Sequence, residues 1–192
     1  TAMAQVLCGQ VNPSGKLADT FAARLEDYPS TENFHESVEY VDYTEDIYVG
    51  YRYFETIPGA AEKVVYPFGY GLSYTTFEVE TQKAWEEADS INVQVKVTNT
   101  GDMAGKEVVQ LYYSAPQGLL KKPAKELGAF KKTRLLQPGE SHTMVLTVTK
   151  EAMASYDDLG KVAKSAYVLE KGAYAFYIGT SVRNNEKTAY EY

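Results

Sequence analysis

The chain has 192 residues, of which 44% are hydrophobic and 23% are charged, and its formal net charge is −7. This composition is typical of a globular protein, and the excess of acidic residues argues against a nucleic-acid partner. No run approaches the roughly 18 consecutive apolar residues of a membrane-spanning helix, so the sequence predicts no membrane partner. The single cysteine, Cys8, excludes an internal disulfide and says nothing about the compartment.

Residues 1–9 have the pattern of a helix end. Met3, Val6 and Leu7 share one face at helical spacing, and Gly9 fits a C-terminal cap. A helix this short is marginal by itself, so we expect its N-terminal part and the body it packs on to lie upstream. Cys8 is expected to be buried. The sequence carries no signal-peptide pattern, and the localisation stays unknown.

Residues 10–74 alternate turn signals with aromatic stretches. The Asn12-Pro13-Ser14-Gly15 stretch predicts a turn, with a short strand over residues 16–21 after it. Between residues 46 and 54 apolar and polar side chains alternate, which predicts an extended segment with one covered face. Regular elements are too few here for an independent core. We therefore expect residues 12–74 to form an extended layer with a partly exposed aromatic face, lying over a larger α/β body.

From about residue 75 the sequence has the pattern of successive strands. They are predicted at 91–97, 109–113, 127–135, 143–148, 167–169, 174–178 and 188–192, with turn residues about every ten residues. This spacing is typical of an immunoglobulin-type β-sandwich. Strand alternation predicts a core built from Ile91, Val93, Val95, Val97, Val109, Leu111, Met144, Leu146, Val148, Tyr174, Phe176 and Ile178.

Candidate binding and catalytic residues are few. One basic cluster is interpreted as a solvated face: Lys121, Lys122, Lys125, Lys131, Lys132 and Arg134. Asp42, Glu45 and Asp46 lie close together, and paired carboxylates can serve as general acid and base, but in a polar linker such groups are usually solvated.

The remaining motif classes are absent from the sequence. Neither His35 nor His142 has a serine or cysteine in a nucleophile context, and neither a phosphate loop nor a metal-ligand spacing occurs. We expect no catalytic, cofactor-binding or metal-binding residue in this chain, and therefore no cofactor.

Several stretches, in collinear order, resemble one known family. Residues 11–21, and 66–74 with the order Tyr-Pro-Phe-Gly-Tyr-Gly-Leu-Ser-Tyr, are similar to the end of the second domain of family 3 glycoside hydrolases, the β-glucosidase and β-xylosidase family. The later stretches are similar to the fibronectin type III-like domain of the same family; they are residues 95–101, 105–112, 125–130, 136–140 and 179–183.

The resemblance implies a mainly β fold in two parts. Residues 1–74 would be the tail of an (α/β)6 sandwich domain and a linker, and residues 75–192 a fibronectin type III-like β-sandwich. Members of the family add a (β/α)8 barrel. A barrel aspartate attacks the sugar and a glutamate acts as acid and base, with the two carboxyl groups about 5 Å apart.

Neither motif that carries these carboxylates occurs here, so neither role is carried over to a residue of this chain. Ala18 and Ala22 stand where the family commonly has proline, which is more similar to members whose barrel follows the sandwich domains. The partners implied are the missing barrel and α/β domains, with a β-glucoside as the substrate of the parent enzyme.

Three functions remain open at this point. The first is a fragment of a retaining β-glycosidase that braces the catalytic domains. The second is a free-standing carbohydrate- or protein-binding β-sandwich module, and the third is an intact small enzyme. A bracing fragment should expose an apolar, aromatic patch and could form a homodimer in isolation. A sugar-binding module should show an aromatic platform flanked by polar side chains.

Overall fold

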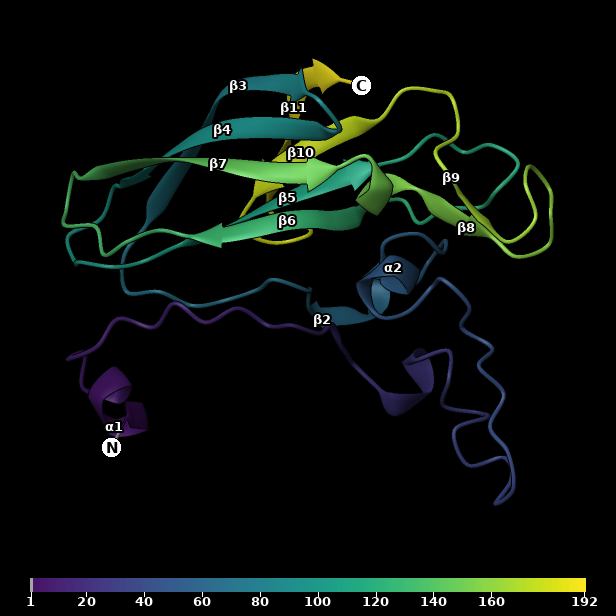
Figure 1. Cartoon of the computed structure of the whole chain (residues 1–192). Coiled ribbons are helices and arrows are strands. Elements are labelled where there is room, and N and C mark those ends of the chain that lie inside the picture. The colour runs from purple at the N-terminus through teal and green to yellow at the C-terminus, as the bar shows by residue number, and fades with distance from the viewer. Residues whose placement is uncertain (1) are drawn as a thin grey trace.

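The computed structural model describes residues 2–192, and its main body is two packed antiparallel sheets (Figure 1). One sheet has the order β3 (Phe77–Glu87), β4 (Ser90–Asn99), β7 (Ser141–Thr149). The other has the order β11 (Asn185–Glu191), β10 (Ala175–Gly179), β5 (Val108–Ser114), β6 (Glu126–Lys132). The chain is mainly β, and the expected β-sandwich is confirmed.

The core lies between the two sheets and contains all twelve residues that strand alternation predicted. Ile91, Val93 and Val95 on β4 stand opposite residues of β7, the last of them opposite Met144. Each of these three valine and isoleucine side chains is fully buried. The register of β4 is therefore the one that the alternation requires, because a slip by one residue would turn these side chains to the solvent.

Strand β3 is an addition to the expected elements. Its burial pattern alternates only weakly, and its outward face carries Glu78, Glu80 and Lys83. An edge strand with one solvated face needs few apolar residues, and charged side chains protect such edges from pairing with other chains. The sequence around Trp85 therefore has an acidic, polar composition although it forms a strand of 11 residues.

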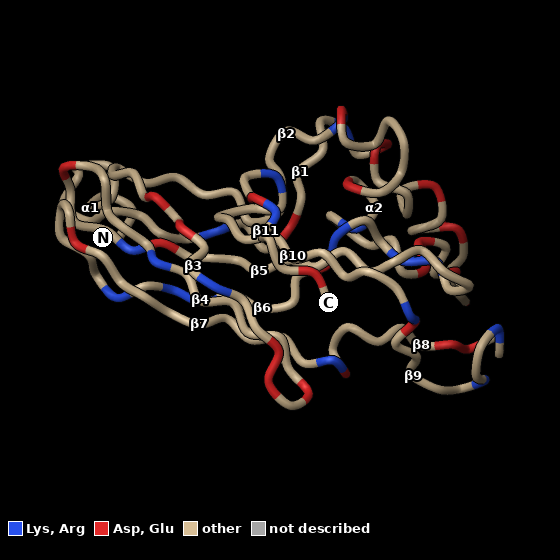
Figure 2. The backbone as a smooth tube through the Cα atoms, turned by 90° about the horizontal axis from the view of Figure 1, so that it is seen from above, with Lys and Arg blue, Asp and Glu red and all other residues tan. Residues whose placement is uncertain are grey.

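A small hairpin stands outside both sheets. It consists of β8 (Ser155–Asp157) and β9 (Ala166–Val168), which pair only with each other and follow the short η3 helix (Glu151–Met153). In Figure 2 this hairpin projects from one end of the sandwich. The strand expected at 167–169 is present, one residue earlier than expected.

Residues 2–74 form a layer beneath the sandwich (Figure 1). Its regular elements are α1 (Ala2–Leu7), η1 (Leu25–Asp27), α2 (Tyr51–Phe54) and η2 (Ala61–Lys63), together with β1 (Phe21–Ala22) paired to β2 (Val64–Tyr66). Most of the layer is irregular, as expected. The strand expected over residues 16–21 is reduced to the two residues of β1.

The extended segment expected over residues 46–54 is wrong. Residues 51–54 form the helical turn α2, which begins after Gly50 with a φ of 57°. A helical turn places Tyr51 and Phe54 on the same face, three residues apart, and Phe54 is 1% exposed. The burial of this pair against the layer and the sandwich outweighs the alternating pattern, which taken alone favours a strand.

Two expectations about single side chains are also wrong. Cys8 is exposed, because it directly follows α1 and no residue of this helix is buried within the described chain. Lys122, expected on a solvated face, is 2% exposed. Its ammonium group is held by an acidic partner that the local sequence does not contain.

No helix within residues 2–192 has the length and apolarity needed to cross a membrane. In Figure 2 many of the aspartate and glutamate positions, in red, lie at the end of the molecule that holds α2. No lysine or arginine occurs between Arg24 and Arg52, a stretch with eight acidic residues. A surface of this charge repels a phosphate backbone.

Candidate functional site

The most elaborate site of the described chain is the contact between residues 2–74 and the four-stranded sheet. Strand β5 is buried on both of its faces: Val109 and Leu111 point into the core, while Gln110 and Tyr112 point outward yet are only 3% and 0% exposed. An outward-facing side chain of a sandwich is buried only when another element covers that face. The covering element is the layer formed by residues 2–74.

Tyr51 on α2 is the centre of this contact. Its ring centroid lies 4.6 Å from that of Phe68 and 6.2 Å from that of Tyr112. Its hydroxyl oxygen accepts a hydrogen bond of 2.8 Å from the backbone N–H of Leu127, at the start of β6. Tyrosine suits this position, because its ring packs on apolar surface while its hydroxyl satisfies a backbone donor.

Gln110 and Gly69 fix the approach of the chain to the sheet. The side-chain amide of Gln110 donates to the carbonyl of Thr180 at 3.0 Å and accepts a hydrogen bond from the Tyr112 hydroxyl. Gly69 has a φ of 81°, and a Cβ at this position would overlap the Gln110 side chain. Burial raises the pKa of Tyr112 far above its ordinary value, so this hydroxyl stays protonated and remains a donor.

Asn12 ties the front of the layer to its end. Its side-chain oxygen accepts hydrogen bonds from the backbone N–H of Tyr74 at 2.9 Å and from the Ser73 hydroxyl at 3.0 Å. Its side-chain nitrogen donates to the carbonyl of Ala104 in the sandwich, at 3.1 Å. The two motifs at 11–21 and 66–74 are therefore one structural unit, and Asn12 links both of them to the β-sandwich.

Three ion pairs join the layer to the sandwich. Lys16 contacts Glu107 at 2.8 Å, Arg52 contacts Glu126 at 3.2 Å, and Arg183 contacts Glu55 at 2.8 Å. The first pair is the most buried, with side-chain exposures of 15% and 11%. Such pairs contribute little energy by themselves when they are exposed, but they fix the orientation of one surface on the other.

The loop that receives the layer is held by the buried Lys122. Its ammonium group donates to the Leu120 carbonyl at 3.0 Å and forms an ion pair with Glu170. The Glu170 carboxylate also accepts hydrogen bonds from the backbone N–H groups of Leu119 and Leu120. The hydrogen bond from Lys122 lowers the pKa of Glu170 below its ordinary 4.5.

This network contacts the layer through one further hydrogen bond. The backbone N–H of Ala124, two residues after Lys122, donates to the hydroxyl of Thr56 at 2.8 Å. A loop whose position is fixed by a buried charge network presents this N–H in one place. The network therefore supports the contact without being part of it.

Residues 2–74 expose many large apolar side chains besides their acidic ones. Sixteen of the large apolar side chains of residues 2–74 are exposed, against seven in the rest of the chain. Among them are Tyr43 at 92%, Leu25 at 69% and Phe34 at 63%. An apolar surface of this extent is typical of a protein-protein or domain-domain contact.

The carboxylates and histidines considered from the sequence do not form a site. Asp42 and Asp46 are exposed, and Glu45 is half-buried, with its carbonyl engaged by the Tyr48 N–H of the same turn. His35 is exposed beside Phe34, while His142 lies on β7 in the sandwich. Within residues 2–192 no three or more histidine, cysteine or acidic side chains are placed to hold a metal ion.

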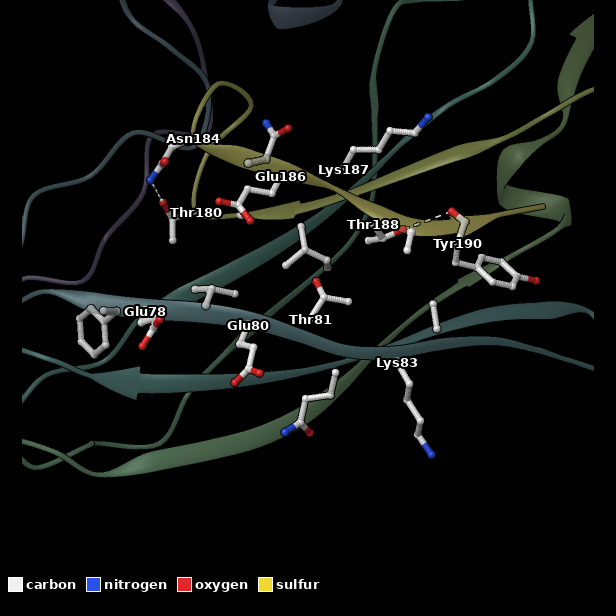
Figure 3. A pocket seen from close by; sticks show the side chains of 18 residues that line it. Glu78, Glu80, Thr81, Lys83, Thr180, Asn184, Glu186, Lys187, Thr188 and Tyr190 are labelled. Atoms are coloured by element: carbon white, nitrogen blue, oxygen red, sulfur yellow. Dashed lines mark hydrogen bonds between the residues drawn. The ribbon is translucent and has the colours of Figure 1, made fainter.

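A groove of about 870 Å³ runs between the edge strands β3 and β11 (Figure 3). Its labelled lining is mostly polar or charged, with Glu80 and Thr81 on one side and Glu186 and Thr188 on the other. Its two aromatic side chains, Phe77 and Tyr190, both pack against the core, and the Tyr190 ring lies 6.0 Å from that of Phe176. The groove lacks the aromatic platform that we require for a sugar site, and the bulge of β3 near Thr81 hinders addition of a strand.

The tip of the β8–β9 hairpin is organised by one carboxylate. Asp157 is fully buried and accepts hydrogen bonds from the four successive backbone N–H groups of residues 160–163, at 2.6 to 3.0 Å. These four donors, of which the Val162 N–H has the largest effect, hold the pKa of Asp157 at about 2, below its ordinary 3.8.

The Asp157 carboxylate is expected to make the hairpin tip sensitive to strong acid. Because the folded pKa is depressed, its contribution is complete above pH 3.8 and is lost as the pH falls through about 2. Asp157→Asn should speed hydrogen exchange of the four amides at neutral pH, whereas Asp158→Asn, at an exposed neighbour, should leave them unchanged. Equal exchange in both variants would contradict this role.

Sequence reasoning missed several of these residues for a common reason. The partners of Tyr112 and Lys122 lie 61 and 48 residues away, and Asp157 is buried by the conformation of the loop at residues 160–163. Local sequence patterns report neither a distant partner nor a loop conformation. The Gly-rich order of residues 66–74 is a local signal that could have indicated the contact, because glycines between aromatics permit tight bends and close backbone approach.

The comparisons with known proteins agree with this architecture. Residues 1–74 match the profile of the glycosyl hydrolase family 3 C-terminal domain, and residues 107–182 match that of the fibronectin type III-like domain. Beta-glucosidase A of Butyrivibrio fibrisolvens is 64% identical over 100% of this chain, and a beta-glucosidase of Ruminococcus albus is 48% identical over 96% of it. The chain spans 25% and 19% of the lengths of these two relatives.

Solved structures show the same fold. A beta-glucosidase of Paenibacillus barengoltzii superposes with a TM-score of 0.95 at 56% identity, covering 98% of this chain and 21% of that one. Beta-glucosidase 3B of Thermotoga neapolitana, solved with glucose, gives a TM-score of 0.85 at 42% identity and covers 99% and 26%. With both profiles, the relatives and the structures in agreement, the chain belongs to glycoside hydrolase family 3, of which it carries C-terminal domain sequence followed by the fibronectin type III-like domain.

Proposed function

We propose that this chain is the bracing part of a retaining β-glycosidase of the β-glucosidase type. The observation that carries the proposal is the two-faced layer of residues 2–74. One face binds the sheet through Tyr51, Gly69 and Asn12, and away from this contact the layer exposes large apolar side chains. A layer of this kind can hold the sandwich in a fixed position relative to a domain that covers its other face.

The residues that would cover that face belong, in this proposal, to the (β/α)8 barrel and the α/β sandwich of the full-length enzyme. These domains would supply both catalytic carboxylates, and a β-glucoside would be the substrate. Support comes from the relatives, which are named as beta-glucosidases and are four to five times longer than this chain. The domain boundary is proposed at residues 74 and 75, where the layer passes into β3.

The chain alone is expected not to hydrolyse aryl β-glucosides. A sharper test grafts it into the Butyrivibrio fibrisolvens enzyme in place of the matching segment, which is 64% identical. The graft should keep activity, and deletion of the segment should abolish it. The proposal would be contradicted if the isolated chain, after repurification, still hydrolysed the substrate and lost this activity when one of its acidic residues was replaced.

Self-association of the isolated chain is a finer proposal from the same surface. An exposed apolar face without its cover can be buried against a second copy. Light scattering of the purified chain should then show a dimer that dissociates when Phe34 and Tyr43 are both replaced by serine. If the chain is monomeric at all accessible concentrations, dimerisation is contradicted. The bracing role is then still tested separately by the graft experiment.

A further inference from the structure

The β8–β9 hairpin presents two tyrosine rings that are uncovered in the described chain. Tyr156 and Tyr167 are cross-strand partners, with ring centroids 5.2 Å apart and an interplanar angle of 60°. Their exposed fractions are 53% and 72%. The Asp157 carboxylate, which neighbours one of them, holds the hairpin tip in one conformation through its four hydrogen bonds. The rings are therefore displayed on an ordered support.

These rings border a recess of about 730 Å³. Its walls come from three parts of the chain: the hairpin, the segment at 120–126 after β5, and the segment at 46–52 in the layer. The volume is within the range of small-molecule sites, which is about 300–1,000 Å³. The recess also lies where the layer meets the sandwich, so both parts of the chain contribute to it.

The recess is lined by four acidic and three basic side chains, so its net charge is small. Arg52 and Glu126 form an ion pair at 3.2 Å, and the Asp157 carboxylate is engaged by its four backbone N–H donors. Asp46 and Asp158 with Lys121 and Lys161 make no ion pair among residues 2–192 and remain able to donate or accept hydrogen bonds. A ligand with a strong net charge of either sign gains nothing from such a lining.

We propose that this recess binds a neutral oligosaccharide, with Tyr156 and Tyr167 against the faces of its sugar rings. A sugar ring has apolar C–H faces, which pack on an exposed aromatic ring, and hydroxyl groups at its rim, which bond to carboxylates and ammonium groups. The recess offers both kinds of group. This is the aromatic platform with polar flanks that the β3–β11 groove lacks.

Other ligand classes fit this lining less well. A nucleic acid requires an excess of positive charge, and the recess has none. A protein partner usually buries an apolar centre with charges at the rim, whereas here the charged side chains line the recess itself. Among neutral oligosaccharides we choose a β-linked glucose oligomer, and this choice rests on the proposed function. The inference that the recess is a sugar site does not depend on that function.

The test is a titration of the ¹⁵N-labelled 192-residue chain with cellotetraose, followed by NMR, with maltotetraose as a second arm. Saturable shifts of amides in residues 156–167 are expected. Tyr167→Ala and Tyr156→Ala should each weaken binding by about tenfold or more, and Tyr167→Phe should retain it. Tyr40→Ala, at a tyrosine 56% exposed and outside the recess, is the matched control and should leave the affinity for cellotetraose unchanged.

The outcomes separate this inference from the bracing role. Binding of maltotetraose in place of cellotetraose, at the same amides, would support the site and exclude the β-glucan preference. An absence of saturable shifts up to about 10 mM of both sugars would overturn the site, even where the graft experiment succeeds. Unchanged binding by the alanine variants would also overturn the site. If an alanine variant fails to fold, the amide shifts of the unmodified chain decide whether the site exists.

Discussion

Replacing Lys122 by methionine is expected to lower the free energy of unfolding by about 3 kcal/mol. Methionine fits the volume of the lysine stem, but it leaves the Glu170 carboxylate without its counter-charge and the Leu120 carbonyl without its donor. Removing one partner of a buried ion pair costs far more than the pair contributes, because the remaining charge stays buried. Urea unfolding followed by circular dichroism measures the change.

The matched control is Lys121→Met, one residue earlier and exposed, which is expected to change the free energy of unfolding by less than about 0.5 kcal/mol. The unmodified protein should also show a contribution from Glu170 that depends on pH. Because its folded pKa is depressed, this contribution is complete above pH 4.5 and is lost as the pH falls through the lower folded value. Equal stabilities for the two methionine variants would show that Lys122 is held by packing alone.

Replacing Gly69 by valine is expected to detach residues 2–74 from the sheet. The φ of 81° excludes a β-branched residue without strain, at a cost of about 1–3 kcal/mol. The new side chain would also displace Gln110, whose hydrogen bond from Tyr112 is buried and whose hydrogen bond to Thr180 is partly buried. Limited proteolysis should then cleave near Ser73, and the sandwich should keep its own unfolding transition.

Gly15→Val is the control for this substitution. Gly15 lies in the same layer, has no positive φ, and a Cβ there meets no atom within 4 Å. The variant should resist protease like the unmodified chain. Resistance of Gly69→Val to the same protease would contradict the idea that this glycine sets the approach of the layer to β5.

Patterns of period two predicted the sandwich well because its strands are half-buried, one face inward and one outward. Val93 and Val95 could be placed in the core for this reason, and their register is as expected. The same rule failed for α2, where alternation at residues 47–53 is coincidental and burial of Phe54 requires a helical turn. It also gave no sign that the outward side chains of β5 are covered.

The contact between layer and sheet was beyond sequence reasoning for a physical reason. Tyr51 and Tyr112 are 61 residues apart, and nothing in either local pattern specifies the other. Lys122 and Glu170 are likewise separated by 48 residues, so they come into contact only when the fold is complete. The glycines at 69 and 71 were informative because a backbone conformation, unlike a distant partner, leaves a local trace.

The double burial of β5 has a consequence for the order of events during synthesis. Residues 2–74 leave the ribosome before the sheet they cover, because that sheet includes β10, which ends at Gly179. Until Gly179 has been made, the face of the layer that binds the sheet has no complete surface to bind, and side chains such as Tyr51 and Phe68 stay accessible to other nascent chains. Unpaired apolar segments of this kind are prone to aggregate and are bound by chaperones. Slowing translation between residues 75 and 179 should therefore lower the yield of soluble protein more than slowing it before residue 75.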